Sequence, residues 1–391
     1  MNTPSRFPPR SRVSAIRLDS YEKDAVNQAM ERLLDPLGGI ERFVKTDAPV
    51  VLKPNFLAPR SVDKAVCTHP EVIRAAAHLV RKAGAAKIIV TDSPGVGNAR
   101  RCAKRIGLVD DDSFTVENAE DGIYLDRPET GFHHLRLSRR IVEAGTVINL
   151  AKAKTHGKTV ITAAVKNTFG AMLGMEKAQW HLRIGKELRP FAELIVHIHS
   201  LVAPSLSILD AVVGMEGNGP GSGDPRPLGI LLASDNAHAV DAIFCRVIGL
   251  GPKEVPTLAV AQDLGLLGPI DEIEVVGDSI GDIQPNPPWR MARIGTTERI
   301  LSSGLINNLL DRFLSLKPAV NQKKCTACGQ CEEICAAKVI TINKKAKPPA
   351  PRMIIDDKRC ISCFCCQEIC PEGAIRVKAG LGARILGLGT R

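Results

Sequence analysis

Residues 50–95 read VVLKPNFLAPRSVDKAVCTHPEVIRAAAHLVRKAGAAKIIVTDSPG. The runs at 49–52 and 87–91 are short, apolar and rich in Val and Ile, which is typical of buried strands. Between them, apolar residues recur at helical spacing after His69-Pro70, and Gly84 closes the pattern. The stretch therefore predicts a strand, a helix and a second strand.

The same alternation continues along the chain. We expect further strands at 146–150, 206–209, 228–232 and 273–276, and a helix at 237–248. Short apolar strands separated by helices indicate an α/β fold, with a mostly parallel sheet covered by helices on both faces. We place this domain at residues 15–295, after a flexible tail at 1–14 that is rich in Pro, Arg and Ser.

Polar side chains follow several of these strands, where open α/β sheets bind their ligands. Three Lys, a His, two Asn and a glycine-rich loop at 215–223 suggest an anion-binding crevice, because backbone N–H groups of such a loop can hold a phosphate or a carboxylate. An ordinary surface turn and structural side chains are the alternatives. The candidates are Lys53, Asn55, Lys154, His156, Lys166, Asn167, Glu216, Asn218 and Gly219.

Composition excludes several classes of protein. The 391 residues are 44% hydrophobic, 24% charged and 4% aromatic, as in a globular protein with little aromatic surface for stacking on bases or sugars. No stretch approaches eighteen uninterrupted apolar residues, so we expect no membrane span. The N-terminal residues contain no apolar run typical of an export signal, and we expect a cytoplasmic protein.

The charge and the cysteines concentrate at the C-terminal end. The net charge is +10, and residues 319–391 carry 13 Lys and Arg against 6 Asp and Glu, or +7. Nine of the twelve Cys lie between Cys325 and Cys370. Because this basic segment is rich in cysteine and lacks base-reading groups, we expect metal binding and no nucleic-acid partner.

The cysteines form two sets with C-x2-C-x2-C-x3-C spacing, CTACGQCEEIC at 325–335 and CISCFCCQEIC at 360–370. In this spacing three thiolates hold one [4Fe–4S] cluster and the fourth reaches the other cluster. Zinc sites take two pairs of ligands, which this pattern does not match. We therefore expect two [4Fe–4S] clusters, one held by Cys325, Cys328, Cys331 and Cys370, the other by Cys360, Cys363, Cys366 and Cys335.

Residues 318–377 resemble a bacterial two-cluster ferredoxin, which implies a small C-terminal α+β ferredoxin-type iron–sulfur domain at 319–378. Three features depart from that pattern: Ala336 replaces a proline, a basic insertion lies at 344–352, and Cys365 is additional. The insertion is either a solvated loop or a docking site for an acidic partner. We interpret Cys365 as a free thiol, with a role as an alternative ligand left open. An amphipathic connector helix is expected at 296–318, and a glycine-rich tail at 379–391.

Four motifs of the larger domain resemble the DUF362 family. They are Lys53-Pro54-Asn55, Lys154-Thr155-His156, Lys166-Asn167 with Gly170, and Glu216-Gly217-Asn218-Gly219-Pro220. The resemblance spans about residues 45–285. It implies the architecture found here, since members often carry a C-terminal two-cluster ferredoxin, but it supplies no catalytic residues.

These observations favour an iron–sulfur redox protein that exchanges electrons with an external carrier and with a small anionic substrate. Lys154, His156 and Lys166 are the predicted catalytic residues, with His156 as proton donor. Two further hypotheses concern Asp92, Asp210 and Glu216: one of these carboxylates orients His156, or one binds a divalent cation. The alternatives are a non-catalytic electron-transfer subunit that docks a larger oxidoreductase, and a carrier of labile clusters, which eight thiolate ligands argue against.

Overall fold

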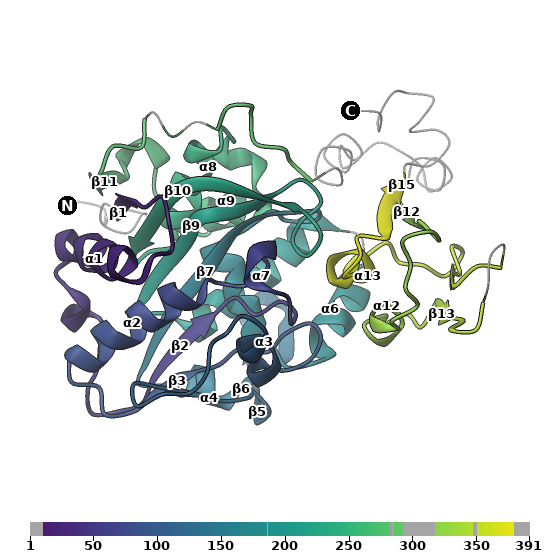
Figure 1. Cartoon of the computed structure of the whole chain (residues 1–391), viewed down its shortest axis with the longest axis horizontal. Coiled ribbons are helices and arrows are strands. Elements are labelled where there is room, and N and C mark those ends of the chain that lie inside the picture. The colour runs from purple at the N-terminus through teal and green to yellow at the C-terminus, as the bar shows by residue number, and fades with distance from the viewer. Residues whose placement is uncertain are drawn as a thin grey trace.

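The computed structural model describes residues 11–185, 187–281, 283, 285–292, 317–346 and 350–378. Residues 11–292 form the α/β domain, and residues 317–378 form a small domain that contains both cysteine sets (Figure 1). The predicted connector helix lies outside the described residues except for 317 and 318, which begin a strand. The predicted tail at 379–391 also lies outside them.

Nine strands form the main sheet, and most neighbouring pairs are parallel. The antiparallel pairs are β1–β10, β9–β10 and β7–β8. The order is β11-β1-β10-β9-β7-β2-β3-β4, with β8 paired to β7. The strands are β1 (Arg12–Arg17), β2 (Val50–Pro54), β3 (Ile88–Val90), β4 (Thr115–Val116), β7 (Thr146–His156), β8 (Val160–Thr162), β9 (Leu206–Glu216), β10 (Asp224–Ser234) and β11 (Glu274–Gly277).

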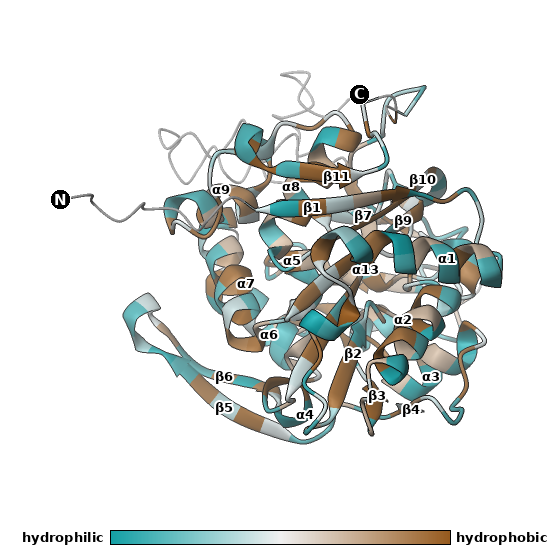
Figure 2. Ribbon diagram, turned by 90° about the vertical axis from the view of Figure 1, so that its left-hand side faces the viewer, coloured by the Kyte–Doolittle hydropathy of each residue, from teal (hydrophilic) through white to brown (hydrophobic). Residues whose placement is uncertain are grey.

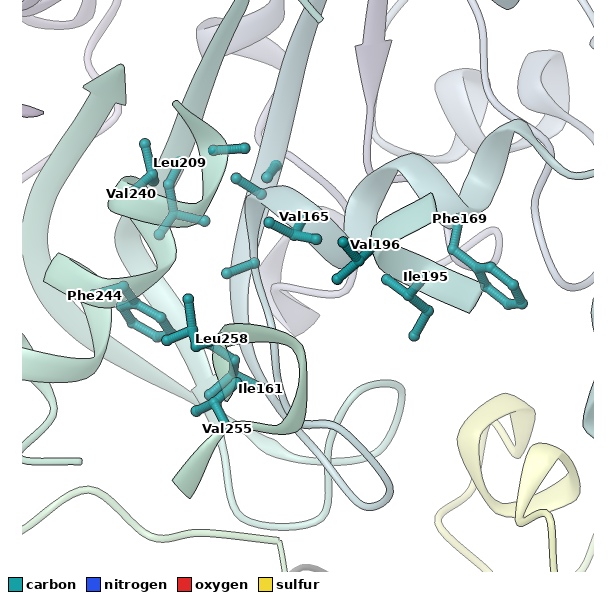
Figure 3. Close-up of a cluster of buried hydrophobic side chains, with 14 of the residues drawn as sticks. Ile161, Val165, Phe169, Ile195, Val196, Leu209, Val240, Phe244, Val255 and Leu258 are labelled. Atoms are coloured by element: carbon teal, nitrogen blue, oxygen red, sulfur yellow. The ribbon is translucent and has the colours of Figure 1, made fainter. Parts of the chain in front are cut away.

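Helices cover both faces of this sheet, as predicted. The strand β2 shows the alternation, because Val50 and Leu52 face one core and Val51 faces the other. One face carries α1 (Lys23–Leu34), α2 (Pro70–Lys82) and α3 (Ala99–Arg105). The other carries α5 (Ala164–Asn167), α7 (Leu188–Val202), α8 (Ala237–Val247) and α9 (Pro256–Asp263), whose packed side chains are shown in Figure 3.

Three predicted boundaries are wrong. Strand β1 begins at Arg12, inside the predicted tail, and pairs with both β10 and β11. Strands β7 and β9 each span eleven residues and continue past the predicted ends at 150 and 209. The extensions contain charged residues, which the strands accommodate because Lys152 of β7 is paired with Asp210 of β9 at 2.7 Å.

The chain order of the strands reverses between β2 and β7. From β2 the chain builds outward through β3 and β4, and then returns to place β7 and β9 on the other side. In open α/β sheets, such a reversal leaves a crevice at the carboxyl ends of the two strands. Lys53, Asn55, Lys154 and His156 lie at this point, which explains why the motif residues gather.

Smaller elements surround the sheet. A hairpin of β5 (Gly122–Arg127) and β6 (Phe132–Ser138) extends from the body (Figure 2). The helices α4 (Arg139–Val142) and α6 (Glu176–Ile184) complete the α/β domain. The cysteine domain pairs β12 (Lys317–Val320) with β15 (Ile375–Lys378) and β13 (Ile340–Ile342) with β14 (Met353–Ile355), and contains α12 (Gln330–Glu333) and α13 (Cys365–Ile369).

Candidate functional site

The eight predicted ligand cysteines line two separate small cavities. The first cysteine cavity contains Cys325, Cys328, Cys331 and Cys370. The second cysteine cavity contains Cys335, Cys360, Cys363 and Cys366. Each cavity thus combines three predicted ligands from one set with the fourth from the other set, as in two-cluster ferredoxins, and Cys365 also lines the second cavity.

The surroundings of these cavities suit iron–sulfur clusters. The two loops share a conformation, because Ala327 and Ser362 hold equivalent positions in the two sets and both have φ of 55°. Backbone N–H groups of Val339 and Ala374 point at Cys335 Sγ and Cys370 Sγ, at 3.5 and 3.3 Å. Such N–H groups stabilise thiolate charge. All twelve cysteines are free in this structure.

A third cavity lies between the two domains and encloses about 100 Å³. We call it the lysine cavity, because Lys154, Lys166 and Lys177 line it. The α/β domain supplies most of its wall, and α13 of the cysteine domain supplies Cys365, Glu368 and Ile369. Figure 1 shows α13 beside α6, where the two domains meet.

Hydrogen bonds from deep in the α/β domain fix the floor of the lysine cavity. The Asp241 carboxylate accepts from the backbone N–H groups of Ala164 and Val165, at 2.6 and 3.2 Å, and thereby anchors the first turn of α5. Helix α5 then places Lys166 and Asn167. Asn167 Oδ1 accepts from Asn55 Nδ2 at 2.9 Å, so both predicted amides lie in one network.

The lysines are held in different ways. Lys154 Nζ donates to Asn55 Oδ1 at 2.8 Å and to Val66 O at 2.9 Å, and Lys177 Nζ donates to Ser93 O at 2.6 Å. Among the described residues, the Lys166 ammonium has no hydrogen-bond acceptor and lies 5.4 Å from the centre of the Phe169 ring. Lys166 is thus the cation with the most capacity for a bound anion.

Burial changes the charge state of this cavity. It lowers the pKa of Lys154 to about 7, and burial also lowers the pKa of Lys177 to about 7. Burial raises the pKa of Glu368, but His156 and Lys166 outweigh it and lower that pKa to about 2. The cavity therefore combines the ionised Glu368 carboxylate with lysines that can lose their protons near neutral pH.

His156 faces Glu368 across the domain boundary. His156 is fully buried, and its Nε2 lies 3.1 Å from Glu368 Oε1. The geometry is not that of a hydrogen bond, and Nε2 has no hydrogen-bond partner among the described residues. Its Nδ1 accepts from the N–H groups of Lys158 and Thr159 at 3.0 and 3.2 Å. Burial lowers the pKa of His156 to about 4, so the ring is neutral near pH 7 with its proton on Nε2.

Lys53 acts through Asp92 rather than through direct contact with the cavity. The two side chains form a buried ion pair at 2.8 Å, and Asp92 lines the cavity. Gly170 lies against this pair, and a Cβ at that position would overlap Asp92 Oδ1 and approach Lys53 Nζ to 2.8 Å. The glycine of the Lys166-Asn167 motif is therefore required by packing.

The glycine-rich loop after β9 contacts the cysteine domain, and Pro220 is its residue that lines the lysine cavity. Asn218 Oδ1 accepts from Gln367 Nε2 at 2.9 Å, and Ser222 Oγ donates to Cys370 O at 2.8 Å. Gly221 packs so closely on Glu368 O that a Cβ would overlap it. The loop holds the cysteine domain in place, because its glycines allow the two backbones to approach.

Two other predicted binding residues also lie outside the lysine cavity. Glu216 accepts from Arg290 N and Nε, at 3.0 and 2.8 Å, and its charge is compensated there. Gly219 packs against Thr155, where a Cβ would overlap the Thr155 carbonyl oxygen. Both residues stabilise the loop, and neither lines the lysine cavity.

Comparison with known proteins agrees with this architecture. The family model described as "Domain of unknown function (DUF362)" matches residues 50–246, and a 4Fe–4S dicluster domain model matches residues 324–374. The chain belongs to the DUF362 family. A thylakoid-associated protein of Synechocystis is 40% identical over 257 residues, which cover 65% of this chain and 79% of that protein.

Solved structures show a more distant likeness. A protein of Thermotoga maritima has a TM-score of 0.40 at 10% identity, over 63% of this chain and 60% of that one. The lactate racemase apoprotein of Thermoanaerobacterium thermosaccharolyticum has a TM-score of 0.38 at 12% identity, over 63% of this chain and 59% of that one. The chain thus spans about three fifths of each solved chain, and neither likeness bears on function.

Sequence reasoning about this DUF362 protein missed Lys177 and Glu368. Lys177 lies on α6, outside the family motifs, and has no spacing signal. Glu368 lies between two predicted ligands, where it reads as a spacer residue. Only the docking of α13 against the α/β domain shows that Glu368 faces His156.

Two other expectations concern metals and membranes. Within residues 11–185, 187–281, 283, 285–292, 317–346 and 350–378, no three His, Cys, Asp or Glu side chains are placed to hold a single metal ion. The hypothesis of a divalent cation gains no support from the structure. In the same part of the chain, no helix is long and apolar enough to cross a membrane.

Proposed function

We propose that this DUF362 protein transfers electrons between two [4Fe–4S] clusters and a small anionic molecule bound in the lysine cavity. The observation that carries the proposal is the position of Cys365. This residue lines the second cysteine cavity and also lines the lysine cavity. The candidate cluster site and the candidate substrate site thus share one lining side chain.

The ligand assignment follows the two cysteine cavities. In this proposal Cys325, Cys328, Cys331 and Cys370 hold one cluster, and Cys335, Cys360, Cys363 and Cys366 hold the other. Bound clusters would supply one-electron transfer. The match of residues 324–374 to a 4Fe–4S dicluster model supports this assignment.

The charge of the lysine cavity supports an anionic ligand. Four lysine ammonium groups (Lys53, Lys154, Lys166 and Lys177) lie in or next to it, against the carboxylates of Asp92 and Glu368. The excess positive charge would be neutralised by a bound carboxylate or oxyanion. Thr162 Oγ1 and His181 Nδ1 are buried there without a hydrogen-bond partner among the described residues. A polar ligand in the cavity would supply a partner for either atom.

Lys154 fits the role of proton donor better than His156. An imidazole with a pKa near 4 is neutral at pH 7, whereas an ammonium group with a pKa near 7 gives up a proton readily. Each electron that the bound molecule accepts would be matched by one proton from the Lys154 ammonium, and the resulting amine would be reprotonated from solvent. His156 would keep Glu368 in place beside the bound molecule.

Reoxidation of reduced protein by candidate anions tests the proposal. The holoprotein is reduced, freed of reductant under anaerobic conditions, and mixed with a panel of small carboxylates and inorganic oxyanions while the visible absorption is followed. We expect at least one anion to reoxidise the wild-type protein. Lys166→Met should weaken that response at least about tenfold, because the anion loses its free cation.

The exposed Lys344→Met variant is the matched control, since it removes the same charge from the basic insertion. It should behave as wild type. If Lys166→Met and Lys154→Met both react as wild type does, the lysine cavity is not the site. That result would favour the alternative of a non-catalytic electron-transfer subunit that docks a larger oxidoreductase.

A further inference from the structure

A wide groove lies between the two domains near the first cysteine cavity. Its volume is about 1230 Å³, and it shares Pro371 and Glu372 with the wall of that cavity. We call it the basic groove, because six cationic side chains line it: Arg60, Lys64, Arg105, Arg290, Lys324 and Arg376. Two acidic side chains, Asp224 and Glu372, also line it.

Half of these cations have neither an ion-pair nor a hydrogen-bond partner among the described residues. Arg290 pairs with Glu216 and Asp224, Lys64 pairs with Asp63, and Arg60 donates to Ile369 O at 2.8 Å. In contrast, the exposed side chains of Arg105, Lys324 and Arg376 make no ion pair or hydrogen bond within the described residues. They come from three separate segments of the chain, so the groove collects charge that no local salt bridge explains.

The first cysteine cavity also reaches the surface. Cys328, one of its four cysteines, is the only exposed cysteine among the twelve, all of which the structure describes. In the second cavity Cys335, Cys360 and Cys363 are half-buried and Cys366 is buried. Electron transfer from another protein needs an exposed cluster edge, and the first cavity offers one beside unpaired positive charge.

We infer that the basic groove is the docking site for an acidic one-electron carrier protein, which exchanges electrons at the first cysteine cavity. A partner with a negative face would complement Arg105, Lys324 and Arg376 and would be steered toward Cys328. Electrons would then pass from a protein in the groove through the first and the second cysteine cavity to the lysine cavity. The inference rests on the proposed electron-transfer function, but it concerns the opposite end of that path.

The basic insertion at 344–352 is the rival surface, and it supplies a matched control. The groove variant combines Arg105→Glu with Arg376→Glu. The insertion variant combines Lys344→Glu with Lys345→Glu, and both variants change the net charge by the same amount. All four side chains are exposed, so neither pair removes packing from a core. Iron content and visible spectra of each holoprotein confirm that the clusters are retained.

Binding of an acidic [2Fe–2S] ferredoxin to the full-length holoprotein is measured by calorimetry at low and high salt. For wild type we expect binding that weakens steeply with salt. The Arg105→Glu, Arg376→Glu pair should raise Kd at least about tenfold, and the insertion pair less than about twofold. Stopped-flow reduction by reduced ferredoxin should slow in the groove variant, while reduction by dithionite should not change.

Two results would overturn the inference: no ferredoxin binding by wild type at low salt, or loss of binding in the insertion variant alone. Binding of anionic lipid vesicles that depends on Arg105 and Arg376, without ferredoxin binding, would also overturn it. Lys166→Met serves to separate the two proposals. It should bind ferredoxin and accept its electrons as wild type does, even if the lysine cavity proves to have no substrate.

Discussion

The two cysteine sets have nearly the same sequence pattern but lie in different surroundings. Glu333 and Glu368 hold equivalent positions, two residues before the last cysteine of each set. Glu333 is exposed, whereas Glu368 lies 3.1 Å from the buried His156. The equivalent Ile334 and Ile369, in contrast, both pack in one apolar cluster with Ala58 and Val96 of the α/β domain.

This difference shows how a duplicated motif acquires two roles. Ile334 and Ile369 both contact the α/β domain and line the lysine cavity, but only α13 adds a charged side chain, Glu368, to that cavity. In the two proposals, the second cysteine cavity therefore lies beside the lysine cavity, and the first cysteine cavity lies beside the basic groove. Changes at equivalent positions of the two sets should therefore have unequal effects.

The largest expected effect is loss of a cluster. Cys366→Ala removes a thiol of the second cysteine cavity and should reduce iron and acid-labile sulfide from about eight to about four per chain. It should also abolish anion-dependent reoxidation, because the remaining cluster lies on the groove side. Iron and sulfide analysis of anaerobically purified protein checks this outcome.

The adjacent Cys365→Ala is the control. We expect it to keep about eight iron atoms, because Cys365 is not among the proposed ligands. If Cys365→Ala loses half the iron and Cys366→Ala does not, Cys365 is the ligand and the assignment of the second set is wrong.

A smaller effect is expected from the loop that holds α13. Gly221→Ala places a methyl group against Glu368 O and should destabilise the docked arrangement by about 1–3 kcal/mol. The thermal unfolding midpoint of the holoprotein should fall by several degrees. Anion affinity should fall with it, because Glu368 no longer closes the lysine cavity.

Gly281→Ala provides the comparison. A Cβ there has no neighbour closer than 3.9 Å, and the backbone is not left-handed, so the midpoint should stay unchanged. Equal midpoints for the two variants would mean that the loop does not hold the cysteine domain as the structure describes.

The smallest expected effect is a dependence on pH. Because Lys154 and Lys177 have pKa values near 7, anion affinity should fall roughly five- to tenfold between pH 7 and 8 as they lose protons. The charges that face Lys154 are Lys152, Lys166 and Glu368, and those that face Lys177 are Asp92, Lys53 and Lys166.

Protein stability should change in the opposite direction. The pKa values are lower in the folded protein than in the unfolded chain, so the unfolded chain binds more protons above pH 7 and stability rises with pH. Titration calorimetry and denaturant unfolding across pH 6–9 separate the two trends. A constant anion affinity over this range would show that the two lysines do not titrate there.

Several features of the molecule were predictable from local pattern. The stretch 50–95 predicted a strand, a helix and a strand, and the structure has β2, α2 and β3 there. Apolar runs also predicted the two-faced sheet, and the motifs predicted the family. The extensions of β7 and β9 were not predictable, because buried Lys and Asp residues are acceptable in a strand only when a partner such as Asp210 lies opposite.

The sequence by itself determined the spacing of the thiols and the alternation of strands and helices, because both depend on residues close together in the chain. It also placed Lys154 and Lys166 near the carboxyl ends of the strands. Only the tertiary structure decided which charges share a cavity. Glu368 and His156 are far apart in sequence, and Gly221 allows them to meet because its missing side chain lets α13 approach.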